Sequence, residues 1–202
     1  MRTLDVSKIP KPNFDFERFK VWRNQNTKFF IEIGCGVGRH PIQWAKNNPE
    51  CQILAIERTS DKFEKFERRL TSHRTKFPTQ YQNIWAAHAE AAVLLPHLKL
   101  SPLVDGIFYF YPNPEAKAKN RQLAESPLLP FLFEILKPGG RLLVASNVAS
   151  YIDGLARVAI AIGFKPSVAT QISSVGSPRT HFEKKYLERG DACFEIEMIK
   201  PQ

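Results

Sequence analysis

Short apolar runs alternate with longer helical stretches along the chain from residue 28 onward. This alternation is typical of right-handed βαβ units, in which mainly parallel strands form one sheet with helices on both faces. The order therefore predicts an α/β fold. The five strands expected in alternation with helices lie at residues 29–33, 52–56, 83–87, 106–110 and 141–145.

Two further β-type runs, near residues 168–172 and 192–199, follow the helix expected at residues 151–162. No helix is expected between these two runs, so we predict an antiparallel hairpin at one edge of a seven-stranded sheet. A nicotinamide-dinucleotide fold would more naturally continue to a sixth parallel strand. Residues 1–27 are expected to form an arm and a short helix, packed on a domain of residues 28–202.

The chain of 202 residues carries 29 Lys and Arg against 20 Asp and Glu, a formal net charge of +9. This excess favours a polyanionic partner or an anionic membrane surface. No apolar run approaches the length of a membrane span, and the N-terminus has no apolar signal core. Three widely spaced cysteines argue against zinc or a disulfide framework. We therefore expect a cytoplasmic protein with reduced thiols and no metal.

A glycine-rich turn, EIGCGVG at residues 32–38, ends the first expected strand and opens a helix. Glycines at alternate positions permit a tight turn and let the backbone approach a ligand at a helix N-terminus. Glu57 ends the second strand, where a carboxylate can bind the two hydroxyls of a ribose. Glu90 follows the third strand, where it can accept from an adenine amino group. The alternative for each glutamate is a solvated charge at the start of a helix.

The spacing of this set resembles the class I S-adenosylmethionine-dependent methyltransferases, including the acidic residue before the glycines and the KPGG turn at residues 137–140. The resemblance covers about residues 29–199 and implies a Rossmann-like methyltransferase fold with S-adenosylmethionine as cofactor. It implies that the glycines line the methionine moiety, that Glu57 binds the ribose, and that Glu90 and its neighbours bind the adenine. The cofactor-binding residues implied are Glu32, Gly34, Cys35, Gly36, Gly38, Glu57, Arg58, Ala89, Glu90 and Tyr111.

Three downstream motifs resemble those of the tRNA (guanine-N7-)-methyltransferases, in the same order. Residues 111–121 are similar to that family's proline-flanked acidic turn with a trailing basic run, and residues 146–151 to its Thr-Asp-x-x-x-Tyr segment. Residues 180–183 are similar to its Thr-x-Phe/Tyr-Glu motif. The resemblance implies methyl transfer to tRNA, with catalytic residues Asn113, Glu115 and Glu183 and substrate-binding residues Lys117, Asn147, Tyr151, Thr180 and Glu183.

Two acidic positions of that family carry amides in this chain, at Asn113 and Asn147. Guanine N7 carries no proton, so the enzyme must orient the base and accommodate the positive charge that develops on its ring. Carboxylates suit both needs; Glu183 is retained and Glu115 is new. Either the site is rebuilt around these two glutamates, or the substrate differs.

Structural explanations compete with these assignments. Residues 112–114 could be a rigid turn at a strand end. Asn147 could cap the following helix, and Thr180 with Glu183 could be a capping box. The five histidines are scattered, without a partner at the spacing of metal ligands or a catalytic triad. We expect most of them to be surface or ordinary core residues.

The basic residues gather in particular segments. Residues 58–76 hold seven Lys and Arg against three acids, and pairs such as Glu64–Arg68 and Asp61–Lys65 would neutralise part of that charge. The basic segments 115–121 and 179–189 can both lie at the carboxyl edge of the sheet, where charge can follow RNA phosphates. We therefore expect tRNA or another structured RNA as the partner, and a monomer or homodimer.

Three alternatives stay open at this point. The same cofactor could serve another acceptor, namely a different RNA base, a protein or a small molecule. The amides at positions 113 and 147 also fit a tRNA-binding relative that has lost turnover. A nicotinamide dehydrogenase is the weakest alternative, because the glycine turn and Glu57 suit it but the late strands and the downstream motifs do not.

Overall fold

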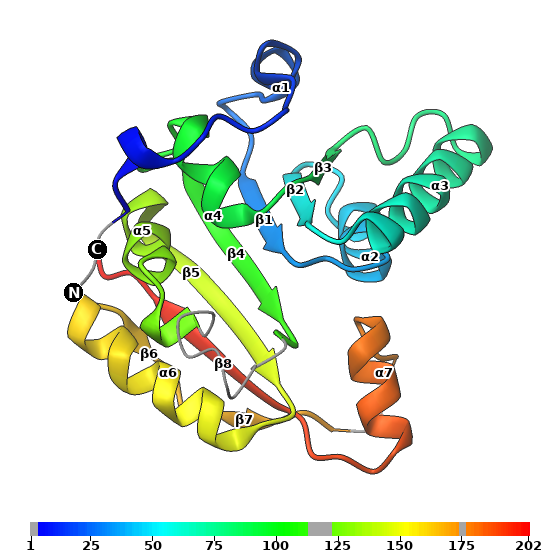
Figure 1. The fold of residues 1–202 in the computed structure, drawn as a ribbon. Helices are drawn as coiled ribbons and strands as arrows, with labels where there is room; N and C mark the ends of the chain where they lie inside the picture. The colour runs from blue at the N-terminus through cyan, green and yellow to red at the C-terminus, as the bar shows by residue number, and fades with distance from the viewer. Residues whose placement is uncertain (1–3, 113–122, 174–176) are drawn as a thin grey trace.

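A computed structural model describes residues 4–112, 123–173 and 177–202. These residues form an eight-stranded sheet in the order β3-β2-β1-β4-β5-β8-β6, with β7 also paired to β8 (Figure 1). β1 to β5 are parallel, and β8 runs antiparallel to β5. The strands are β1 (Phe29–Ile33), β2 (Gln52–Glu57), β3 (Ile84–His88), β4 (Val104–Phe110), β5 (Leu136–Ser146), β6 (Lys165–Pro166), β7 (Thr170–Gln171) and β8 (Phe194–Ile199).

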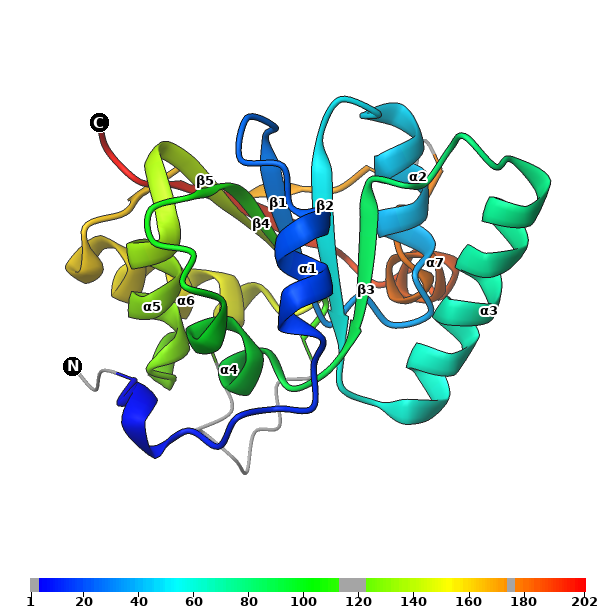
Figure 2. The same ribbon diagram turned by 90° about the horizontal axis from the view of Figure 1, so that it is seen from above.

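Helices cover both faces of the sheet (Figures 1 and 2). One face packs against α1, α4, α5 and α6 in a cluster that includes Phe19 and Leu132. The other face packs against α2 and α3 through Ile42 and Phe66. The expected Rossmann-like fold is therefore confirmed. The helices are α1 (Phe16–Trp22), α2 (Arg39–Asn47), α3 (Ser60–Lys76), α4 (Ala91–Leu94), α5 (Leu128–Ile135), α6 (Ala149–Ile162) and α7 (His181–Glu188), with short 3₁₀ turns at Val6–Lys8, Leu95–Leu98 and Leu123–Glu125.

The central strands align their carboxyl ends at one edge of the sheet. In the parallel register Ile33 of β1 pairs with Ile56 of β2 and with Tyr109 of β4, and Glu57 of β2 pairs with His88 of β3. Every residue of β1 and β2 is buried, which explains why both strands read as continuous apolar runs in the sequence. The loops that follow these strands consequently meet at one edge, where ligands bind in open α/β sheets.

The C-terminal part differs from the sequence expectation. A helix, α7, lies between β7 and β8, so the prediction of two consecutive strands without a helix was wrong. The segment is helical because Thr180 caps it, with its Oγ1 accepting from the main-chain N of Glu183 at 2.9 Å. Phe182 and Tyr186, one helical turn apart, pack together in a small cluster against the sheet. In place of the single strand expected near residues 168–172, β6 and β7 are two residues each and both pair antiparallel to β8.

The N-terminal segment packs on the sheet through aromatic side chains. Phe19, buried in α1, lies edge-on to Trp85 of β3, with 5.4 Å between the ring centroids. Trp22 Nε1 donates to the main-chain O of Gln82 at 2.8 Å. These contacts hold α1 against β3, on the face of the sheet opposite to α2 and α3.

Candidate functional site

The glycine-rich loop follows β1 at the carboxyl edge of the sheet. Gly34, Gly36 and Gly38 have φ values of +74°, +59° and +75°, in the left-handed region that glycine adopts without steric cost. The main-chain N–H groups of Gly34 and Cys35 donate to the main-chain O of Ile56 at 2.8 and 3.0 Å. The start of the loop is thereby joined to the end of β2.

The three glycines differ in what surrounds them. A Cβ on Gly38 would lie 1.9 Å from Cδ2 of Phe66, so this glycine is required for packing the start of α2 against α3. A Cβ on Gly34 or Gly36 would meet no atom within 4 Å. The space beside these two glycines is open, so a ligand has room to lie directly against the backbone.

Glu57 ends β2 and is buried, with 4% of its surface exposed. Its Oε2 accepts from the main-chain N of Gly36, and its Oε1 accepts from the main-chain N of Thr59, both at 2.8 Å. The carboxylate therefore fixes both the glycine loop and the start of α3. Each carboxylate oxygen can accept a second hydrogen bond, so Glu57 retains acceptor capacity for a hydroxyl group.

Arg58, Ala89 and Glu90 lie at the neighbouring ends of β2 and β3. The main-chain N of Ala89 donates to the main-chain O of Glu57 at 3.1 Å. Arg58 Nη1 lies 3.4 Å from Glu90 Oε2, with side chains 60% and 48% exposed, so the pair contributes little to stability. The structure thus brings these three residues to the same edge as the glycine loop.

His40 of α2 forms a buried pair with Glu32 of β1. His40 Nδ1 lies 2.7 Å from Glu32 Oε2, and both residues are buried. The imidazole lies edge-on to Phe108 and Phe110, at 4.9 Å between ring centroids in each case. His40 is a core histidine, as the sequence led us to expect for most of the five. In the sequence, the contact between His40 and Glu32 is marked only by their separation of eight residues across the glycine turn.

A cavity of about 60 Å³ lies between the glycine loop and the N-terminal end of α7. Lys62, at the start of α3, lies on its rim, with Nζ 5.1 Å from the ring centroid of Phe182 in α7. Residues at the N-terminal ends of α2, α3 and α7 therefore meet around this cavity. Its lining consists of Glu32, Gly34, Cys35, Gly36, Val37, Arg39, His40, Lys62, Phe110, Thr180, His181 and Phe182.

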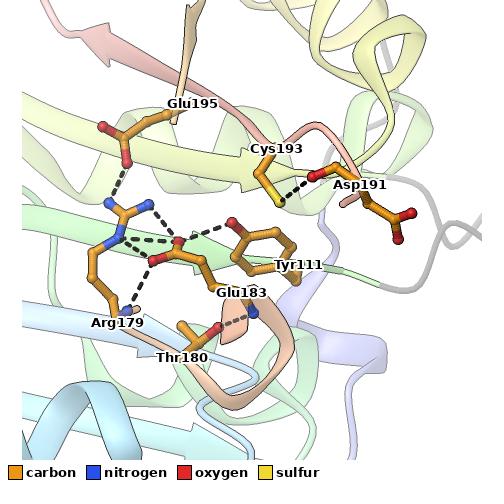
Figure 3. Close-up of polar contacts among 7 residues, drawn as sticks. All are labelled: Tyr111, Arg179, Thr180, Glu183, Asp191, Cys193 and Glu195. Atoms are coloured by element: carbon orange, nitrogen blue, oxygen red, sulfur yellow. Dashed lines mark hydrogen bonds and ion pairs between the residues drawn. The ribbon is translucent and has the colours of Figure 1, made fainter. Parts of the chain in front are cut away.

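Glu183 of α7 lies at the centre of a buried polar cluster (Figure 3). Its carboxylate accepts from the phenol of Tyr111 and from the main-chain N and Nη2 of Arg179, each at 2.8 Å. Arg179 also forms an ion pair with Glu195 of β8, and its guanidinium lies over the ring of Phe110. The side chain of Glu183 is 2% exposed. It therefore joins α7 to the ends of β4 and β8.

Burial and charge act in opposite directions on this cluster. Burial raises the pKa of Glu183, but hydrogen bonds from Arg179, its positive charge and the Tyr111 hydroxyl outweigh burial and leave the pKa lowered. Burial likewise disfavours charged Arg179, yet its contacts with Glu183 and Glu195 raise its pKa. Burial and hydrogen bonds with Cys193 and Glu183 raise the pKa of Tyr111. At neutral pH the cluster holds a charged ion pair beside a neutral phenol.

The structure places only part of the expected acceptor side. Asn113, Glu115 and Lys117 lie outside the described residues. Asn147 directly follows β5 and is half-buried. The N-cap position of α6 is occupied by Val148, so the structure does not support the alternative in which Asn147 caps this helix. Asn147 is therefore left at the carboxyl edge without a capping role.

Two tyrosines, Tyr109 of β4 and Tyr151 of α6, have raised pKa values. Burial and the negative charge of Glu90 raise the pKa of Tyr109 to about 12. Burial and the neighbouring Tyr109 raise the pKa of Tyr151, in the first turn of α6. Both phenols are therefore neutral at physiological pH.

The family model described as "Putative methyltransferase" matches residues 26–196. The chain belongs to this methyltransferase family. The matched region includes the glycine loop, Glu57, the Glu32–His40 pair and the cluster around Glu183. The residues that the fold gathers at the carboxyl edge therefore all lie within the part of the methyltransferase that defines the family.

Curated relatives of the methyltransferase are named tRNA (guanine-N(7)-)-methyltransferase. The protein from Nitrosomonas eutropha is 30% identical over 123 residues, which are 60% of this chain and 52% of that protein. The protein from Nitrosococcus oceani is 25% identical over 175 residues, which are 86% of this chain and 72% of that protein. The matched segment thus spans only about half of the first relative.

Solved structures share the fold of the methyltransferase. The crystal structure of the 16S rRNA methyltransferase KamB superposes with a TM-score of 0.71 at 20% identity, covering 94% of this chain and 96% of that one. A mutant 16S rRNA (adenine(1408)-N(1))-methyltransferase from Catenulisporales acidiphilia, with cosubstrate SAM, superposes with a TM-score of 0.62 at 14% identity, covering 95% and 93%. At these identities the likeness shows a common fold.

The described part of the methyltransferase contains neither a cluster of metal ligands nor a helix that could span a membrane. No group of three or more His, Cys, Asp or Glu side chains in residues 4–112, 123–173 and 177–202 could hold a metal ion. In the same ranges no helix is long and apolar enough to cross a membrane. The chemistry available at the carboxyl edge is that of an open glycine loop, buried carboxylates, neutral phenols and a cationic rim.

Proposed function

We propose that the methyltransferase uses S-adenosylmethionine and methylates structured RNA, with guanine N7 of tRNA as its target. The observation that carries the proposal is the match, over 86% of the chain, to a relative named tRNA (guanine-N(7)-)-methyltransferase. The open glycine loop beside Glu57 supports the cofactor part of the proposal. The motif at residues 180–183 supports the acceptor part.

The residues at the carboxyl edge fit S-adenosylmethionine, which supplies an electrophilic methyl group when it is bound. Gly34 and Gly36 leave space beside the backbone for its methionine part. Glu57 retains acceptor capacity for ribose hydroxyls, and Glu32, whose Oε2 faces His40, retains a second oxygen for an ammonium group. We assign adenine binding to Glu90 and its neighbours. The full proposed set is Glu32, Gly34, Cys35, Gly36, Gly38, Glu57, Arg58, Ala89, Glu90 and Tyr111.

Methyl transfer to guanine N7 requires positioning of the base and does not require proton transfer from it. Guanine N7 has an in-plane lone pair and no proton, so the chain needs no general base to activate it. Its residues must hold the base in line with the methyl group and balance the positive charge that develops on the ring. The residues proposed for these roles are Asn113, Glu115, Lys117, Asn147, Tyr151, Thr180 and Glu183.

The geometry around Glu183 refines its proposed role. In the conformation described, Tyr111 and Arg179 engage its carboxylate. Glu183 would then act on the base through α7, by holding Thr180 and Phe182 at the rim of the cavity. A carboxylate that faces the base directly would require Arg179 to move away first.

A second candidate function is RNA binding without turnover. The amides Asn113 and Asn147 favour it, because both remove a carboxylate that would offset the charge on methylated guanine. The engaged carboxylate of Glu183 favours it for the same reason. This candidate predicts tRNA binding by a protein that transfers no methyl group.

Methyl transfer to an unmodified tRNA transcript separates the two candidates. The purified protein is incubated with S-adenosylmethionine carrying a labelled methyl group, and the tRNA is digested to nucleosides for mass spectrometry. We expect labelled 7-methylguanosine with the wild type and its loss in Glu183→Ala. Glu64→Ala, which removes an exposed carboxylate of α3, should retain full activity. Label in another nucleoside would refute the guanine N7 assignment, and binding without label would establish the second candidate.

A further inference from the structure

Four basic side chains of α3 lie along one side of the helix. Successive residues of an α-helix are about 100° apart, so positions i, i+3, i+7 and i+14 lie along one side. Glu64 and Glu67 lie on the opposite flank together with Arg68, and the buried Phe66 and Leu70 lie between the two flanks. The basic flank, called the basic stripe below, consists of Lys62, Lys65, Arg69 and Lys76.

Acidic neighbours do not neutralise the basic stripe in the described part of the chain. The sequence led us to expect ion pairs of Asp61 with Lys65 and of Glu64 with Arg68. The structure contains neither pair, and Arg68 Nε instead donates to the main-chain O of Glu64 at 3.3 Å. Among the described residues Lys65 and Arg69 form no ion pair, and both are exposed. Their charge is therefore available to a partner.

The basic stripe leads to the rim of the cavity. Its first member, Lys62, lines the cavity together with Arg39 of α2 and lies over Phe182 of α7. Figures 1 and 2 place α7 beside α2 and α3 at this edge of the molecule. α7 adds two exposed lysines, Lys185 and Lys184, of which Lys184 lies 3.5 Å from Glu188 Oε1. Positive charge thus extends from the outer end of α3 to the cavity beside the glycine loop.

We propose that the basic stripe binds the sugar-phosphate backbone of the RNA substrate. The proposal rests on the proposed function for its choice of RNA as the substrate. Lys76 lies 14 residues after Lys62 in α3, or about 21 Å further along the helix, enough to contact several phosphates in succession. Phosphate contacts position an RNA without reading its sequence. That role suits a surface that begins at the rim of the cavity with Lys62 and continues outward along α3.

Burial on α3 favours RNA over an anionic membrane as the partner of the stripe. A helix that lies on a membrane needs exposed apolar side chains beside its basic ones. On α3 the large apolar residues Phe66 and Leu70 are buried against the sheet. Beside the last stripe residue, Lys76, the ring of Phe77 is 37% exposed. One exposed ring at the end of the stripe is much less apolar surface than a membrane-bound helix presents.

A triple charge reversal, Lys65→Glu with Arg69→Glu and Lys76→Glu, tests the stripe. Lys62 stays unchanged, because it lines the cavity. The matched control reverses three exposed basic residues on α1, α6 and β6, namely Lys20, Arg157 and Lys165. Affinity for an unmodified tRNA transcript is measured by fluorescence anisotropy over a range of salt concentrations, and affinity for S-adenosylmethionine is measured in parallel.

We expect the stripe variant to bind tRNA more weakly and with a smaller dependence on salt. If each replaced residue neutralises one phosphate, the slope of log affinity against log salt should fall by about three in the stripe variant. Near 0.1 M salt the affinity for tRNA should then fall on the order of 100-fold. The control variant should stay within about threefold of the wild type, and both should bind S-adenosylmethionine normally. A variant with Gln at the three stripe positions should show the same fall in the slope of log affinity against log salt, without the repulsion that the introduced carboxylates would add.

Three outcomes would overturn the proposal. One is an unchanged slope in both stripe variants. A second is an equal loss in the control variant, since net charge would then account for binding. A third is a wild type that binds phosphatidylserine vesicles and not tRNA. Failure of the proposed function is visible separately, because a protein that binds tRNA through the stripe but transfers no methyl group refutes the function and leaves the docking surface intact.

Discussion

Replacing Arg179 with Met removes a charge from the buried cluster while keeping much of the aliphatic volume. Glu183 would retain two donors, the phenol of Tyr111 and the main-chain N of residue 179. Removing one partner of a buried ion pair costs about 3–5 kcal/mol. Because the Arg179 side chain is 29% exposed and two donors remain, we expect Arg179→Met to lower the free energy of unfolding by about 2–4 kcal/mol.

Urea unfolding at pH 7, followed by tryptophan fluorescence, measures this loss. Glu183→Gln in the Arg179→Met background replaces the uncompensated carboxylate with a neutral amide of similar shape. The double variant should therefore lose less stability than the sum of the two single variants, with a coupling energy of about 1–3 kcal/mol. Single losses that add to within about 0.5 kcal/mol would refute the reasoning that the two charges depend on each other.

The pH dependence should also change sign. In the wild type the pKa of Glu183 is lowered by folding, so its contribution to stability is present above about pH 4.3 and lost as the pH falls through the folded-state value. Without Arg179, burial dominates and the pKa of Glu183 rises above its unfolded value. The variant then loses stability as the pH rises above about 4.3. Its deficit against the wild type should be smaller at pH 5 than at pH 7, and an equal deficit would contradict this account.

Three further predictions concern the cofactor side and the thiols. Gly38→Ala should destabilise the fold by about 2–5 kcal/mol, because strain at positive φ adds to a clash with Phe66. Gly36→Ala, at a position with open space, should cost only about 1–2 kcal/mol. Equal melting temperatures for the two variants would show that the clash at residue 38 is relieved. Glu57→Ala should weaken S-adenosylmethionine binding about 10–100-fold by calorimetry, through loss of charge-assisted hydrogen bonds. An unchanged Kd would remove the ribose assignment, and Glu67→Ala on the exposed flank of α3 is the control. A thiol reagent at pH 8 should label no cysteine in the native protein and all three after unfolding. The reason is that Cys35, Cys51 and Cys193 are buried and that burial raises the pKa of each thiol, that of Cys51 to about 11. Rapid labelling of the native protein would contradict this burial.

The parallel core was predictable because its strands carry their own signal. β1 and β2 are buried along their whole length and read as unbroken apolar runs. α7 was missed because residues 181–188 are rich in charge, and its few apolar side chains pack against residues far earlier in the chain, such as Phe110 and Tyr111. The spacing of Thr180 and Glu183 did contain the signal, since it is the spacing of a capping box, and Thr180 does cap α7.

The part of the site that lies directly at strand ends was predictable from the sequence. Glu57 and the glycines follow directly from strand ends, and the structure brings them within hydrogen-bond distance. The partners of Glu183 were not predictable, because Tyr111 lies 72 residues earlier and Glu195 reaches Arg179 from another strand. Such contacts depend on strand order, which no local pattern specifies.

The place of β8 in the sheet has a consequence for how the chain is made. β8 lies between β5 and β6, although both come earlier in the sequence. Until residues 194–199 have left the ribosome, the free edge of β5 presents unpaired N–H and C=O groups that can template another chain. Pairing across a long sequence separation is also slow. Nascent chains that stall before residue 194 should therefore aggregate, and because they lack Glu195 they also lack the contact that joins Arg179 to the sheet.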